Sequence, residues 1–115
     1  MITTLSQSVA IIDFLDNYKP SQKFLPEDIF LRARVLEIVN TITCDTHPLQ
    51  NPRVIQTYPE DKRPARIREV ITSGLVTVEE LISKHNQSFE GMYCIGNSLT
   101  LADIVLIPQV YNAVR

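Results

Sequence analysis

The stretch "SLTLADIVLIPQVYNAVR", residues 98–115, carries the clearest folding signal of the chain. Thr100 is a typical N-cap residue, and Asp103 follows three positions later, where its carboxylate can accept a hydrogen bond from the backbone N–H of the cap. Leu99 before the cap and Ile104 after it have the spacing of a hydrophobic staple. The stretch therefore predicts a helix that starts directly after Thr100, and we assign Thr100 and Asp103 to folding rather than to chemistry.

The helix that follows Thr100 is apolar on nearly every side. A surface helix has a single apolar stripe, so this pattern predicts a central, buried helix that needs neighbours all round. Pro108 lacks an N–H donor and is expected to kink the helix, at a cost of about 3 kcal/mol in an isolated helix. The apolar positions are Leu101, Ala102, Ile104, Val105, Leu106, Ile107 and Val110.

Three earlier segments also have helical periodicity. Residues 6–17 form an amphipathic pattern, and residues 65–85 have the most regular spacing of apolar side chains. A helix is also predicted from about Glu27 to residues 43–46, with Pro26 near its start and acidic residues in its first turn. The apolar face of this helix is expected to comprise Ile29, Ala33, Leu36, Val39 and Ile42.

The remaining segments contain residues that interrupt helices. Pro20 and Pro26 predict a loop over residues 19–28, and the two glycines of residues 89–98 predict a connection. Residues 46–53 form either a loop or a sharp break between helical pieces. Thr3, Thr4 and Leu5 are better strand formers than helix formers, which suggests a short extended segment before the first helix. The whole pattern predicts an all-α helical bundle.

Composition limits the range of functions. The chain has 115 residues, 44% of them hydrophobic and 21% charged, which is typical of one folded domain. Its net charge is −2, and its one dense basic stretch, residues 62–68, is flanked by acidic residues. Nucleic acid and membrane surfaces are therefore not expected as partners. No segment has the apolar length of a membrane span, and no signal peptide is visible, so we expect a cytoplasmic protein.

The potential ligands and nucleophiles of the chain are scattered. Cys44 and Cys94 lie far apart without a CxxC pattern, which suits a reducing compartment, and both are expected to be buried thiols. His47 and His85 are isolated from other metal-binding side chains, so no metal site is predicted. The glycines form no phosphate-binding loop.

Four stretches together resemble the zeta class of glutathione transferases, the maleylacetoacetate isomerases. They are "SQSVAIIDFL", "HPLQNPRV", "GMYCIGNSLTLADIVLIPQV" and "NAVR", and they occur in the family's order. In that family a thioredoxin-like domain precedes an all-helical domain. The resemblance implies that residues 1–18 are the last helix of the first domain. Residues 19–115 would then be a truncated helical domain of the C-terminal glutathione transferase type, which explains why a helix occurs so early.

The resemblance implies a glutathione-binding role for Gln7 and Ser8. The first turn of a helix presents unpaired N–H groups and a positive dipole end, so these residues can hold the γ-glutamyl carboxylate of glutathione. Without the resemblance, a helix cap formed by Ser6 or Ser8 would be the simpler interpretation.

The segment "HPLQNPRV" resembles family residues that reach glutathione and the substrate. It implies glutathione-binding roles for His47, Asn51, Pro52 and Arg53, although His47 stands where the family commonly has Gln, and Pro52 and Arg53 are also unusual at their positions. Arg115 matches a family arginine that binds the dicarboxylate substrate, since a guanidinium can hold a carboxylate through two parallel hydrogen bonds.

Two functions remain open on this basis. The first is a glutathione-dependent isomerase and transferase of phenylalanine and tyrosine catabolism, a homodimer in its full-length form. In it the glutathione thiolate would add to the double bond of a small dicarboxylic keto acid. No catalytic residue is expected within the chain, because the family's serine motif lies upstream, and the chain alone is expected to be inactive. The alternative is a non-catalytic helical module for protein association, which fold alone does not exclude.

Overall fold

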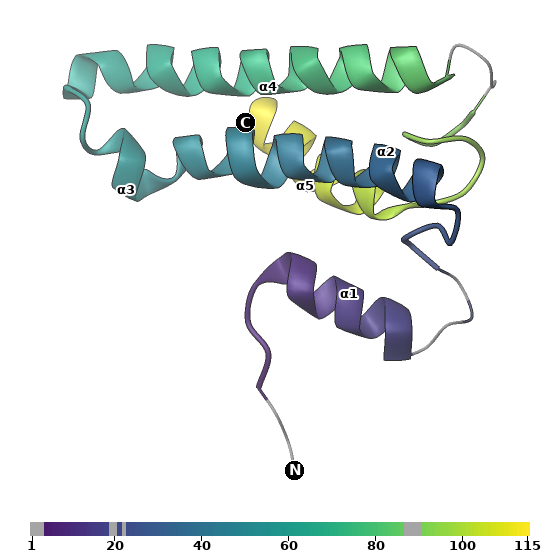
Figure 1. The fold of residues 1–115 in the computed structure, drawn as a ribbon. Coiled ribbons are helices and arrows are strands. Elements are labelled where there is room, and N and C mark those ends of the chain that lie inside the picture. The colour runs from purple at the N-terminus through teal and green to yellow at the C-terminus, as the bar shows by residue number, and fades with distance from the viewer. Residues whose placement is uncertain (1–3, 19–20, 22, 87–90) are drawn as a thin grey trace.

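The computed structural model describes residues 4–18, 21, 23–86 and 91–115, which form helices and loops with no strand among them (Figure 1). Two long antiparallel rods dominate the arrangement. One rod is α2 (Ile29–Asn40), continued by the π-helix η1 (Thr41–Thr46), the 3₁₀-helix η2 (His47–Gln50) and the short α3 (Pro52–Ile55). The other rod is α4 (Arg63–Asn86), which follows the 3₁₀-turn η3 (Glu60–Lys62). The sequence break predicted over residues 46–53 is thus a break between helical pieces.

The helix α5 (Leu101–Ala113) packs on α2 behind this pair of rods (Figure 1). Its first two residues are among the most buried of the molecule, with Leu101 1% exposed and Ala102 fully buried. Full burial of a large aliphatic side chain such as Leu101 contributes about 1.5 to 3 kcal/mol, so this junction stabilises the fold. The core comprises Leu25, Val35, Ile38, Val39, Ile42, Val78, Cys94, Ile95, Leu101 and Ala102.

The start of α5 confirms the predicted capping box. The Asp103 carboxylate accepts hydrogen bonds from the backbone N–H and the hydroxyl of Thr100, both at 2.8 Å. It also accepts one from the backbone N–H of Cys94 at 2.8 Å, so it ties the preceding loop to the helix. Burial raises the pKa of Asp103, but these hydrogen bonds outweigh the effect and leave it below its ordinary value. Asp103 therefore caps α5 and also joins the preceding loop to this helix.

The helix α1 (Ser8–Tyr18) lies along one side of α2 and α5 (Figure 1). Its Val9 and Ile12 pack against the core. Asp16, only 3% exposed, accepts hydrogen bonds from Phe24 N at 2.5 Å and Leu25 N at 3.3 Å. The carbonyl of Phe24 in turn accepts a bond from Leu101 N at 2.9 Å. The loop that contains Phe24 and Leu25 thus fixes α1 relative to the start of α5.

The prediction of which α2 residues are buried is partly wrong. In α2 the buried face is Val35, Ile38 and Val39, whereas Ile29 is 72% exposed and Ala33 is exposed. Ile29 lies in the first turn, which extends past the core, and Asp28 is the N-cap rather than a first-turn residue. Only Val39 and Ile42 of the predicted face are fully buried, and Leu36 is half-buried.

Cys44 corrects a second expectation, because it is exposed whereas Cys94 is buried. Cys44 lies in the wider π-helical turn, which directs Ile42 and Thr46 inward and leaves Cys44 outside. The last helix is likewise not buried all round, since Ile107 is 67% exposed and Tyr111 is 65% exposed. Only its first half reaches the core between α2 and α4.

A short extended segment was predicted before the first helix. Thr4 and Leu5 form no strand, and Thr3 lies outside the described residues. Pro20 and residues 89–90 of the predicted connections also lie outside them. The first helix begins at Ser8 rather than residue 6, and α4 covers the predicted 65–85 helix.

Candidate functional site

A cavity of about 400 Å³ lies where the start of α1 approaches η1, η2 and α5. Its volume is within the usual range of small-molecule sites, and most of its wall is aliphatic with a few polar groups. The aliphatic wall is made by Val9, Ile12, Ile42, Ile104 and Val105. The polar groups are Gln7, Ser8, Thr43, His47 and Gln109. Three of the predicted site residues, Gln7, Ser8 and His47, therefore meet at one cavity although they come from two distant stretches of the sequence.

Gln7 has an unusual backbone conformation. Its φ is 74°, in the left-handed region, and it is the one non-glycine residue with a positive φ among the described residues. Such a conformation costs of order 1 to 3 kcal/mol and occurs often at ligand-binding positions. The carbonyl of Gln7 accepts the hydrogen bond of Ile11 N at 3.0 Å, so Gln7 immediately precedes the first turn of α1. The strained residue turns the chain into the helix at the edge of the cavity.

Ser8 is the first residue of α1 and is exposed at the cavity. The first N–H groups of a helix have no partner within it, and the helix dipole places partial positive charge there. The hydroxyl of Ser8 adds a donor beside these backbone groups. The position therefore suits a carboxylate, and the aliphatic wall beside it suits the apolar part of the same ligand.

His47 begins η2 and is held by a side-chain network with α5. Its Nδ1 lies 3.4 Å from Gln109 Oε1, and Gln50 Nε2 donates to the same oxygen at 2.7 Å. Asn112 donates in turn to Gln50 Oε1. If Nδ1 donates in this contact, Nε2 of a neutral His47 is the acceptor of the ring. The network fixes η2 against α5 and with it the wall of the cavity.

Gln109, like Thr43, lines the cavity and was missed by the sequence interpretation. It is 2% exposed, and its Nε2 has no hydrogen-bond partner among the described residues, while its Oε1 accepts from η2. The signal in the sequence was a glutamine inside the apolar run "LIPQV", because a polar side chain at a buried position needs partners. Here those partners are His47 and Gln50.

The other predicted site residues do not line this cavity. Asn51 is exposed and acts as N-cap of α3, its Oδ1 accepting from Arg53 N at 3.0 Å, and Pro52 is the first residue of that helix. Arg53 is exposed on α3. Arg115 lines a separate, wider groove of about 860 Å³ formed with Ile67, Ile71 and Leu75 of α4. Their roles toward glutathione and substrate stay predictions.

The described residues contain neither a candidate metal cluster nor a candidate membrane span. Residues 4–18, 21, 23–86 and 91–115 contain no group of three or more His, Cys, Asp or Glu side chains that could hold a metal ion. No helix in these ranges is both long and apolar enough to cross a membrane.

The chain is similar to maleylacetoacetate isomerases along nearly its whole length. It is 39% identical to probable maleylacetoacetate isomerase 2 of Drosophila melanogaster and 37% identical to the maleylacetoacetate isomerase of Mus musculus, over 97% of this chain in both cases. These matches cover 48% and 50% of the relatives. The chain thus spans about half the length of the curated relatives it matches, and no family model matches it.

Solved structures agree with this similarity. The maleylacetoacetate isomerase of Anaeromyxobacter dehalogenans 2CP-1, with dicarboxyethyl glutathione and citrate in its active site, superposes with a TM-score of 0.87 at 33% identity. The match covers 96% of this chain and 50% of that one. A bacterial maleylpyruvate isomerase of the zeta class gives the same TM-score and identity, with 54% of its chain covered. The predicted all-α fold and the resemblance to the zeta class are confirmed, and the chain matches the C-terminal helical part of these proteins.

Proposed function

We propose that this chain, which is similar to the helical half of zeta-class glutathione transferases, forms part of a glutathione-dependent isomerase of the maleylacetoacetate type. The single observation that carries the proposal is the convergence of Gln7, Ser8 and His47 on one cavity. These residues were assigned to glutathione from sequence stretches about 40 positions apart. The names of the relatives supply the reaction class.

The cavity fits one end of glutathione. Ser8 and the free N–H groups of the first turn of α1 would hold the γ-glutamyl carboxylate, because both are donors and the helix dipole favours an anion there. The strained backbone of Gln7 would direct its side chain toward the same group. His47, fixed by Gln109, would offer one ring nitrogen to a neighbouring polar group of the ligand.

The chemistry of the reaction would come from the thiolate of glutathione, which adds to the conjugated double bond of the substrate. The residues of this chain would bind and orient, and the aliphatic wall would exclude water from the bound molecule. We propose that the donors that stabilise the thiolate are not among the residues that line this cavity, and that the 115-residue chain alone is inactive. Residues 1–18 would then be the end of a thioredoxin-like domain and residues 19–115 the helical domain.

Several finer parts of the proposal follow from the family resemblance alone. They are a small dicarboxylic keto acid as substrate, with Arg115 as a carboxylate ligand, and roles for Asn51, Pro52 and Arg53 at glutathione. They also include a place in phenylalanine and tyrosine breakdown, a homodimeric full-length form and a cytoplasmic location.

The proposal is tested by the affinity of the chain for glutathione when Ser8 is replaced. Ser8→Ala removes a charge-assisted hydrogen bond and should weaken binding by about 1 to 2 kcal/mol, measured by isothermal titration calorimetry. Ser83→Ala, at an exposed position of α4 away from the cavity, is the matched control and should bind as the parent does. Equal affinities of the Ser8→Ala and Ser83→Ala variants would refute the assignment.

A further inference from the structure

A second cavity, of about 560 Å³, lies at the other end of α2 and shares no lining residue with the cavity at Ser8. It is bounded by the first turns of α2, the last turn of α4 and the connection that leads into α5. Its volume is again that of a small-molecule site. The function proposed above makes no use of it.

Cationic side chains from three separate segments line this second cavity. Lys23 precedes α2, Arg34 belongs to α2, and Lys84 belongs to the last turn of α4. The described lining residues include no Asp or Glu. This concentration of positive charge stands out in a chain whose net charge is −2.

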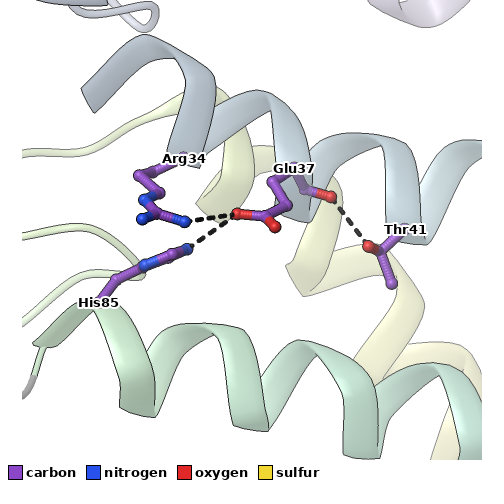
Figure 2. A network of polar contacts seen from close by, with 4 residues as sticks. All are labelled: Arg34, Glu37, Thr41 and His85. Carbon is purple, nitrogen blue, oxygen red and sulfur yellow. Dashed lines mark hydrogen bonds and ion pairs between the residues drawn. The ribbon is translucent and has the colours of Figure 1, made fainter. Parts of the chain in front are cut away.

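A neighbouring carboxylate holds one of the cations in place (Figure 2). Glu37 Oε2 lies 3.2 Å from Arg34 Nη1 and 3.2 Å from His85 Nε2, and thereby links α2 to the end of α4. Burial and the charge of Arg34 lower the pKa of His85, and Glu37 opposes this effect.

Two further carboxylates lie close to the cavity, since Asp28 accepts from the backbone N–H groups of Phe30 and Leu31, and Asp103 accepts from Thr100. The three cations line the cavity, whereas these carboxylates do not line it and are bonded to protein groups.

The connection before α5 gives the cavity a fixed polar wall. Asn86 donates to the carbonyls of Tyr93 at 3.3 Å and Cys94 at 3.4 Å, and its Oδ1 accepts from Gly96 N at 3.3 Å. Gly96 has a φ of 67°, which glycine adopts without strain, and this brings Asn97 and Ser98 to the cavity. Their side chains add donors that a single ligand can reach together.

Other residues of the cavity wall are apolar. Phe30 is 76% exposed and Leu31 is 46% exposed, and both line the cavity together with Pro26 and the buried Ile95. An exposed phenylalanine next to a group of cations provides a contact surface for an aromatic or aliphatic body attached to an anionic head.

We propose that this second cavity binds a small molecule with a doubly charged anionic head on an apolar body, of the phosphate monoester type. Three cationic side chains and no carboxylate line the cavity, which suits a dianion, and Arg34, whose Nη1 contacts Glu37, can donate to phosphate oxygens through its remaining N–H groups. Phe30 and Leu31 would cover the apolar body. The inference is independent of the glutathione site, because the two cavities have no residue in common.

Phenyl phosphate is the probe for this site, titrated into the full 115-residue chain near pH 7.5, where its second ionisation is largely complete. We expect the backbone amide NMR signals of Gly96 and Asn97 to shift, while those of Ile42 and Thr43 at the other cavity stay in place. Inorganic phosphate should bind more weakly, because it lacks the apolar body. Benzyl alcohol should not bind detectably, because it lacks the anionic head. No shift at millimolar phenyl phosphate, or shifts centred on Ile42 and Thr43, would overturn the proposal.

Variants distinguish a defined binding site from nonspecific attraction of the anion to a basic surface. Lys84→Gln and Arg34→Gln should each weaken binding of phenyl phosphate by about five- to tenfold, and Arg34→Lys should recover only part of the loss. Arg32→Gln removes the same charge at an exposed position of α2 that does not line the cavity, and should leave the affinity unchanged. Equal weakening by Arg32→Gln and Lys84→Gln would contradict a defined site. Lys84 makes none of the described ion pairs, so its replacement should leave the fold intact, as circular dichroism can verify.

Discussion

Asp103 shows how much one side chain can do in this fold. Its carboxylate accepts from Cys94 N, Thr100 N and Thr100 Oγ1, so Asp103→Ala leaves two backbone N–H groups buried without a partner. We expect a loss of about 2 to 4 kcal/mol in the free energy of unfolding, measured by urea denaturation. Glu80→Ala, at an exposed position of α4, is the control and should change stability by less than about 0.5 kcal/mol. If both variants unfold at the same urea concentration, the role assigned to Asp103 is wrong.

The charge of Asp103 also predicts acid sensitivity. Its pKa is lowered in the folded state because its hydrogen bonds outweigh the effect of burial. A carboxyl of this kind contributes stability above its unfolded pKa, near 3.8, and loses that contribution as the pH falls through the folded value. The difference in unfolding free energy between the parent and Asp103→Asn should therefore be constant from about pH 7 to 5 and shrink below about pH 4. A difference that grows on acidification would contradict this account.

The two thiols should react very differently. Burial, reinforced by the neighbouring Asp103 carboxylate, raises the pKa of Cys94 to about 12, whereas Cys44 is exposed. Because the thiolate is the reactive form, native protein should release one equivalent of chromophore rapidly with an aromatic disulfide reagent, and unfolded protein two. Cys44→Ser should abolish the rapid phase and Cys94→Ser should retain it. Rapid reaction of both thiols in the native protein would contradict the burial of Cys94.

At the scale of the elements, the contact between α4 and η1 depends on Gly74. A methyl group at this position would overlap Oγ1 and Cγ2 of Thr46, which is 1% exposed and fixed by its hydrogen bond to Thr41 O at 2.8 Å. Gly74→Ala should therefore destabilise by about 1 to 3 kcal/mol, although alanine favours helix over glycine by about 1 kcal/mol. Thermal unfolding followed by circular dichroism measures the effect.

The double variant Gly74→Ala/Thr46→Ala provides the control, since it removes Oγ1 and Cγ2, the two nearest of the three overlapping atoms, and keeps Cβ, so it should recover part of the loss. A stabilised Gly74→Ala variant would show that the two helices can separate at no cost.

The helices themselves could largely be predicted from the sequence. The capping box at Thr100 and Asp103 and the regular spacing over residues 65–85 are local signals, and both elements are present. Which residues of α2 are buried could not be predicted, because the exposure of Ile29 depends on where the other helices end. The π-helical turn at residues 41–46, which exposes Cys44, has no marker in the local pattern either.

For the molecule as a whole, the sequence predicted part of the candidate site. The resemblance to the zeta class pointed to Gln7, Ser8 and His47, and the fold of α1 against η2 and α5 brings them to one cavity. Gln109 could not be assigned, because its contacts with His47 and Gln50 join residues about 60 positions apart. The cationic cavity at Lys23, Arg34 and Lys84 likewise depends on three distant segments that only the fold brings together.

The most direct test of the central claim, that this helical half carries the anchor for a glutathione carboxylate, is an NMR titration of the ¹⁵N-labelled chain with glutathione. We predict that the amide signals of Ser8, Val9 and Thr43 shift progressively, and that those of Gly96 and Asn97 at the second cavity do not. Glutathione in which the γ-glutamyl carboxylate is amidated should give much smaller shifts at Ser8, because the charge that the helix start would bind is gone. Equal shifts with both ligands, or no shift at Ser8 with glutathione at millimolar concentration, would contradict the account.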